Sequence, residues 1–145
     1  MGTSFDVIVI GGGQAGLSAA FFLRRTGLSF VILDESDTAG GAWTKTWNSL
    51  RLFSPVDYSS IAGWQMPQGA DEYPHKDEFV AYLAAYEDRY DLPVERPVRV
   101  TNVSRLEDGF IVRIPNAASG PLSTKSGYFQ KLNSQSRVRA FSTNP

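Results

Sequence analysis

Three glycines near the N-terminus, Gly11, Gly13 and Gly16, have the residue type and spacing that can hold a phosphate group. The first permits a tight turn, the second lets an anion approach the backbone without meeting a Cβ atom, and the third lets a helix pack closely on a sheet. Asp34 lies 18 residues after Gly16, where a carboxylate can accept hydrogen bonds from both hydroxyls of a ribose. Together these four residues favour a dinucleotide site.

The elements that must position these residues are also readable in the sequence. An apolar run over Phe5–Ile10 predicts a buried strand, Gln14–Thr26 predicts a helix that Gly27 ends, and Phe30–Leu33 predicts a second strand. The buried stripe of this helix is expected at Ala15, Ala19, Phe22 and Leu23. In a strand-helix-strand unit of this kind the phosphates lie on the helix N-terminus, whose dipole favours an anion.

The acid after the second strand also indicates which nucleotide is held. Asp34 is the expected ribose acceptor, and the adjacent Glu35 is the alternative. A carboxylate at this place disfavours a ribose 2′-phosphate, so we expect FAD or NAD rather than NADP. A glycine-rich turn between unrelated elements is the simpler interpretation, but it does not explain why strand, glycines, helix, strand and acid occur in this order.

The long segment 36–73 has little periodicity, yet it carries three tryptophans, which favour an ordered loop over disorder. Gly41 permits a close backbone approach, Trp43 could cover a flat ring, and Arg51 could meet a phosphate or carboxylate. For Trp47 and Trp64 we expect a small cluster of packed side chains under the loop.

Several sequence blocks resemble the N-terminal FAD-binding part of the flavin-containing monooxygenase and Baeyer–Villiger monooxygenase superfamily. The blocks are GGGQAGLSAA, VILDES, GGAW, SLRLFSP, YSSIAGWQMP and the run from YPHKDEF to VTNVSR, in that order. The resemblance, closest to small bacterial flavoprotein monooxygenases, covers residues 4 to about 115. It implies an α/β fold: a Rossmann-like FAD-binding domain with a parallel sheet, covering helices and a small antiparallel β layer, incomplete at the C-terminus.

The resemblance also implies roles for individual residues. The FAD pyrophosphate is expected at Gly11, Gly13, Gln14, Ala15 and Gly16, and the ribose at Asp34. The flavin half is expected near Gly41, Ala42 and Trp43, whereas the role of Arg51 in the LRL block is left open. In the family NADPH binds at a second glycine fingerprint, which this sequence does not contain. No catalytic residue is assigned.

A second helix is expected from Lys76 to about Tyr90, with an apolar stripe at Phe79, Leu83, Tyr86 and Tyr90. His75, the only histidine, could exchange a proton near neutral pH, but its place before this helix favours a capping role. Valines across Pro93–Val103, followed by alternating apolar residues at 110–114, predict an antiparallel hairpin.

The chain divides by composition into a domain at 1–115 and an atypical tail at 116–145. The tail has four basic and no acidic residues, and we interpret it as a truncated or frame-altered end; a flexible basic binding arm and an ordinary, poorly ordered terminus are the alternatives. Because its best apolar run, Val138–Phe141, is interrupted by Arg139, the tail is not expected to supply the third strand of the parallel sheet that the resemblance implies, which would leave that sheet with an incomplete edge. The exposed sheet edge would favour self-association.

Composition excludes several classes of function. The net charge of −1 over 145 residues argues against a nucleic-acid partner, and one histidine without cysteine argues against a metal site. No apolar run is long enough for a membrane span, and a cytoplasmic location is expected. The leading hypothesis is a FAD-dependent, monooxygenase-like oxidoreductase acting on a small-molecule substrate. A non-catalytic FAD or adenine-dinucleotide binding module and a short NAD-dependent enzyme are the alternatives.

Overall fold

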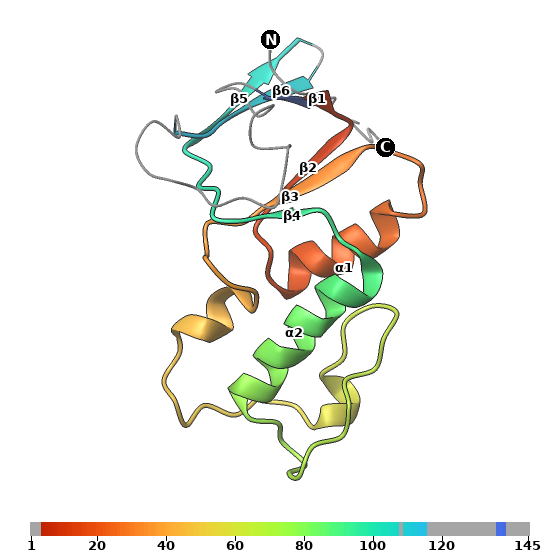
Figure 1. Ribbon diagram of the computed structural model, residues 1–145, viewed down its shortest axis with the longest axis vertical. Coiled ribbons are helices and arrows are strands. Elements are labelled where there is room, and N and C mark those ends of the chain that lie inside the picture. Colours follow the sequence, from red (N-terminus) through yellow and green to blue (C-terminus); the bar gives the residue numbers. More distant parts are fainter. Residues whose placement is uncertain (1–3, 108, 116–135, 139–145) are drawn as a thin grey trace.

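A parallel sheet carries the strand-helix-strand unit predicted from the sequence (Figure 1). The computed structural model describes residues 4–107, 109–115 and 136–138. In the sheet, β2 (Val7–Ile10) pairs with β3 (Phe30–Leu33), and β3 pairs with β4 (Val94–Glu95), all in parallel. The strand predicted at Phe30–Leu33 is therefore confirmed, the one predicted at Phe5–Ile10 is confirmed only over Val7–Ile10, and β4 was not expected to join them.

Helix α1 (Gln14–Leu23) follows the glycine turn and packs beside the second helix below the sheet (Figure 1). It ends three residues before the predicted Thr26, and Gly27 has the left-handed backbone expected of a residue after a helix, with a φ of 74°. The predicted buried stripe is wrong. Leu17, Ala20 and Phe21 are the buried residues, whereas Phe22 is 60% exposed.

A second sheet has the order β1-β7-β6-β5 and lies at the upper end of the molecule (Figure 1). Its strands are β1 (Ser4–Phe5), β5 (Asn102–Leu106), β6 (Gly109–Arg113) and β7 (Ser136–Val138). The hairpin of β5 and β6 confirms the predicted antiparallel layer. The predicted strand over Pro93–Val103 is wrong in its extent, because β4 ends at Glu95 and the next strand begins at Asn102.

Strand β7 joins the second sheet and not the parallel sheet β2-β3-β4, so it does not contradict the prediction that the tail supplies no third strand to the parallel sheet. Its backbone pairs in parallel with β1 and antiparallel with β6, with Ser4 opposite Arg137. The other residues of 116–145 lie outside the described residues, so their predicted lack of order stays a prediction. Among the described strands, β2 still forms an edge of the parallel sheet, which exposes 54% of Ile10.

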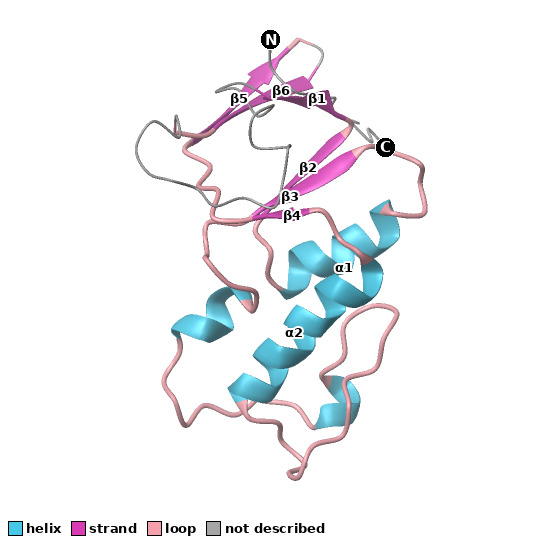
Figure 2. Ribbon diagram, viewed as in Figure 1, coloured by secondary structure: helices cyan, strands magenta, loops and turns pink. Residues whose placement is uncertain are grey.

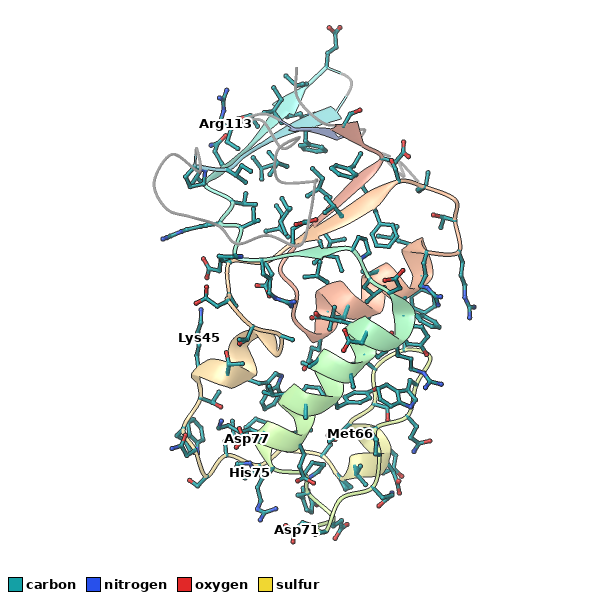
Figure 3. The ribbon with its side chains drawn as sticks, in the orientation of Figure 1. Lys45, Met66, Asp71, His75, Asp77 and Arg113 are labelled. Carbon is teal, nitrogen blue, oxygen red and sulfur yellow. The ribbon has the colours of Figure 1, made fainter. Side chains whose placement is uncertain are left out.

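Helix α2 (Lys76–Tyr90) has the predicted bounds and supplies much of the core. Phe79, Leu83 and Tyr86 of the predicted stripe are buried. His75 is confirmed as the helix cap: its Nδ1 accepts a hydrogen bond from the Asp77 backbone at 3.2 Å, and Glu78 Oε2 accepts one from the His75 backbone at 2.7 Å. His75 and Asp77 lie together at the end of α2 far from the sheets (Figure 3).

Three tyrosines of α2 hold the long loop that precedes it, drawn in pink between the helical segments in Figure 2. The hydroxyls of Tyr82, Tyr86 and Tyr90 donate to the carbonyls of Trp64, Ala62 and Gly63, respectively. Trp64 packs against the Tyr82 ring at 5.1 Å, as predicted for a clustered side chain. The same prediction is wrong for Trp47, which is 63% exposed.

Burial raises the pKa of Tyr86 to about 12. An unfolded tyrosine titrates near 10, so the neutral phenol contributes stability below about pH 10 that is lost as the pH rises toward 12. We expect Tyr86→Phe to flatten this alkaline loss and to cost about 1 kcal/mol at neutral pH, since the Ala62 carbonyl loses its donor. Urea unfolding at several pH values measures both effects. Tyr58→Phe, at a side chain that is 81% exposed, is the control and should leave the pH profile unchanged.

The described residues contain no helix that is both long and apolar enough to cross a membrane.

Candidate functional site

A pocket of about 360 Å³ opens where β2 and β3 end beside the glycine turn. Its lining joins the turn to the end of β3, to the first residues of a 3₁₀ helix (Gly41–Lys45) and to the segment after β4. The lining residues are Ile10, Gly11, Gly12, Gly13, Leu33, Asp34, Glu35, Ser36, Gly41, Ala42, Lys45, Val98 and Val100. Six of the eleven predicted site residues therefore lie in one pocket.

Each glycine of the turn has a different reason to lack a side chain. Gly11 has a φ of 102°, which other residues rarely adopt. A Cβ atom on Gly16 would lie 2.0 Å from the Gly11 carbonyl oxygen, so this glycine lets α1 approach the turn. A Cβ on Gly13 would meet only the Gly41 Cα, at 3.9 Å. The protein fold itself therefore does not require glycine at position 13, and the space is free for a ligand.

The open face of Gly13 also lies at the N-terminus of α1, of which it is the capping residue. Within the described residues, no side chain caps the first turn of this helix by a hydrogen bond. The free N–H groups and the helix dipole at this end are suited to an anion such as a pyrophosphate. The residues present therefore fit the phosphate part of a dinucleotide.

Asp34 and Glu35, which the sequence left as alternatives for the ribose, differ strongly in their surroundings. The Asp34 side chain is 7% exposed and its Oδ2 accepts a hydrogen bond from Arg96 Nε at 2.7 Å. Glu35 is 55% exposed and lies 3.7 Å from Lys45 Nζ and 3.8 Å from Arg99 Nε. Asp34 is thus a buried carboxylate held in the pocket wall by Arg96, whereas Glu35 is an exposed acid whose surface ion pairs are weak.

Arg96 and Glu87 were missed by the sequence analysis. The guanidinium of Arg96 also donates from Nη1 and Nη2 to the two oxygens of Glu87, at 2.7 and 2.6 Å. Burial alone would lower the pKa of Arg96, but the hydrogen bonds that Arg96 donates to Glu87 and Asp34 raise this pKa above its ordinary value. The guanidinium therefore stays positively charged. Arg96 lay inside the predicted strand Pro93–Val103, and neither its residue type nor its place before Pro97 indicated this role.

A second pocket of about 230 Å³ lies between the first residue of α1, the long loop and α2. Gln14 and Trp43 line it together with residues of the long loop and Phe79. Trp43 Nε1 donates to Gln14 Oε1 at 3.0 Å, and the Trp43 ring packs edge-on against Phe79 at 5.2 Å. Residues that are adjacent in the sequence line the two pockets: Gly13 and Ala42 line the first pocket, and Gln14 and Trp43 line the second.

Three predicted residues line neither pocket. Gly16 acts through the packing of α1, and Ala15 is exposed on the first turn of this helix. Arg51 Nη1 donates to Asp71 Oδ2 at 2.8 Å and to the Tyr73 carbonyl at 2.9 Å. Asp71 lies at the end of the molecule opposite the sheets, so Arg51 is engaged there (Figure 3).

Comparisons with known proteins agree with this geometry. An uncharacterized oxidoreductase CzcO of Bacillus velezensis is 37% identical over 109 residues, which cover 75% of this chain and 32% of the relative. The structure of a flavin-containing monooxygenase from Stenotrophomonas maltophilia has 48% identity and a TM-score of 0.80, over 95% of this chain and 37% of that one. A steroid monooxygenase bound to NADP has 26% identity and a TM-score of 0.73, over 94% and 25% of the two chains.

The chain thus spans about a third of the length of these relatives. The Rossmann-like fold predicted from the sequence and the resemblance to flavin-containing monooxygenases are both confirmed. The sequence model of one family matches residues 8–125, which is most of the chain and includes the glycine turn, Asp34 and both helices. The chain therefore belongs to the pyridine nucleotide-disulphide oxidoreductase family.

Proposed function

We propose that this chain binds FAD, with the adenosine half in the pocket at Asp34, the pyrophosphate at Gly13 and the flavin half toward Trp43. The observation that carries the proposal is the unfilled space at Gly13, which lies between a helix N-terminus and a buried carboxylate. When bound, FAD would supply the redox chemistry. The protein's own residues would bind it, orient it and exclude water from one side.

The second pocket supports the placement of the flavin half. Trp43 and Phe79 present aromatic faces and edges suited to a flat ring, and Gln14 offers an amide beside them. The hydrogen bond from Trp43 Nε1 fixes the Gln14 side chain, so the wall is ordered before a ligand arrives. Ser54, Ser59 and Ser60 add hydroxyl groups to the lining of this pocket.

The activity proposed for the complete system is that of an NAD(P)H-dependent flavoprotein monooxygenase acting on a small organic molecule. The chain carries one glycine fingerprint, and the resemblance places NADPH at a second. We therefore propose that this chain alone binds flavin but turns over slowly or not at all. A cytoplasmic location accords with the absence of cysteine from the sequence.

Titration of the protein with FAD tests the cofactor proposal. We expect the visible absorption bands of bound oxidised flavin and quenching of flavin fluorescence, with weaker binding of NAD. Asp34→Ala should weaken FAD binding by at least about tenfold, because each charge-assisted hydrogen bond to ribose contributes about 1.5–3 kcal/mol before water compensates. The fold should survive, since Arg96 and Glu87 remain a neutral pair.

Asp37→Ala is the matched control, because Asp37 is an exposed acid three residues away that does not line the pocket. It should bind FAD like the parent protein. Unchanged affinity in Asp34→Ala would move the ribose acceptor to Glu35. Binding of NAD but not FAD would instead support a short nicotinamide enzyme.

A further inference from the structure

A buried ion-pair network joins the pocket wall to helix α2. Asp34 at the end of β3, Arg96 after β4 and Glu87 in the last turns of α2 have side chains only 7%, 13% and 12% exposed. One cation therefore lies between two carboxylates. Because Glu87 takes both Nη groups and Asp34 takes Nε, the guanidinium is held at three points and cannot rotate.

This arrangement leaves Asp34 with unused acceptor capacity that faces the pocket. An ionised carboxylate has about four acceptor positions. Arg96 Nε occupies one on Oδ2, and the Ser36 backbone N–H occupies one on Oδ1, at 3.3 Å. The two remaining positions match the two hydroxyls of a ribose in number. The Arg96 contact therefore orients the carboxylate without consuming the positions that a ribose needs.

The network also touches the glycine turn. A Cβ atom on Gly12 would lie 2.7 Å from Arg96 Nη2 and 2.8 Å from Asp34 Oδ2. Gly12 has no positive φ that would demand glycine. Because Gly12 has no side chain, the ion pair of Arg96 and Asp34 can pack directly against the glycine turn. The position of the guanidinium therefore depends on the turn proposed to hold the phosphate.

We propose that Arg96 is a positioning residue that sets the orientation of Asp34 for recognition of both hydroxyls of the adenosine ribose, and that Glu87 fixes Arg96 for this purpose. The inference rests on the proposed FAD site and deepens it. An ion pair that only stabilised the fold would change the binding of all nucleotides equally. A positioning role changes the discrimination between ligands that differ only in a ribose hydroxyl.

The test measures this discrimination directly. ADP and 2′-deoxy-ADP compete with FAD on the full chain, and the ratio of their dissociation constants is determined by fluorescence. For the parent protein we expect ADP to bind about tenfold more tightly, because the deoxy ligand leaves a buried acceptor unpaired. Arg96→Lys keeps the charge but cannot span both carboxylates, and its ratio should fall to about threefold or less.

Two further variants make the test robust. The paired change Arg96→Met and Glu87→Met removes the cation together with the carboxylate that fixes it, leaves Asp34 without its ion-pair partner, and should also lower the ratio. Arg99→Met is the matched control: Arg99 is 77% exposed, lies 3.8 Å from Glu35, and should leave the ratio unchanged. Circular dichroism confirms that each variant is folded, and Arg96→Lys carries the test if the paired variant is not.

The outcomes separate this inference from the function on which it rests. A ratio that falls in both Arg96 variants and holds in Arg99→Met supports the positioning role. Equal weakening of ADP and 2′-deoxy-ADP, with the ratio retained, overturns it while leaving the FAD site intact. Failure of the parent protein to bind FAD or ADP overturns the proposed function itself, and the inference with it.

Discussion

Gly13→Val should leave the protein folded and abolish most of its FAD affinity. The capping position at Gly13 has an extended backbone, with a φ of −84° and a ψ of −173°, which valine adopts readily. The nearest protein atom to an added Cβ is the Gly41 Cα, at 3.9 Å, so the side chain occupies space that the fold leaves open. A pyrophosphate must use the same space. We expect FAD to bind at least about 100-fold more weakly, as overpacking of this kind costs up to about 3 kcal/mol.

Flavin fluorescence titration measures this loss, and thermal unfolding without ligand measures any change in stability. The stability change should stay near 1 kcal/mol, the usual cost of replacing a favourable helix cap. Ala19→Val, at an exposed position of α1 six residues after Gly13, is the control for adding bulk to this helix. Full retention of FAD by Gly13→Val would show that the phosphate binds elsewhere.

Gly16→Ala should have the opposite profile and destabilise the fold before any ligand is added. Its Cβ would lie 2.0 Å from the Gly11 carbonyl oxygen and 3.2 Å from the Gly11 carbonyl carbon, both backbone atoms that cannot rotate away. Either α1 must move off the sheet or the turn must deform. We expect a loss of roughly 1–3 kcal/mol or more in the free energy of unfolding, a large share of the stability of a small domain.

The free energies of unfolding of Gly16→Ala and Gly27→Ala, both measured in urea, are compared to isolate the cost of the steric clash at Gly16. Gly27 has a φ of 74°, but nothing lies within 4 Å of an added Cβ. Its substitution should therefore lower the free energy of unfolding only through backbone strain, by about 1 kcal/mol. A Gly16→Ala variant as stable as the parent protein would mean that the close approach of α1 to the turn is not needed for folding.

Local patterns predicted the elements whose signals are strong and short in range. The glycine turn, β3, the bounds of α2 and the cap at His75 each follow from residue types that favour one backbone conformation or one partner. The placement of Asp34 beside the turn followed from the same unit, because parallel strands bring their carboxyl ends to one edge of a sheet.

The buried face of α1 could not be predicted from periodicity, because its sequence is apolar on nearly every side. The position of Gly16 indicates the buried face of α1 better than the apolar periodicity does. A helix that approaches the turn through Gly16 must also turn Ala20, four residues later, toward the sheet, and Ala20 is fully buried. Arg96 had no such signal, since its two partners are 62 and nine residues away in the sequence and meet only in the folded chain.

The pairing of β1 with β7 has a consequence for the order in which the chain folds during synthesis. The β2–β3 ladder closes a loop of about one supersecondary unit and can form while translation continues. Ser4 and Phe5, in contrast, pair with Arg137 and Val138, so their ladder must wait until more than 130 further residues, about a whole domain's length, have been synthesised. The two halves of the predicted first strand, separated only at Asp6, therefore belong to different stages of folding: Val7–Ile10 to an early nucleus and Ser4–Phe5 to a later closure.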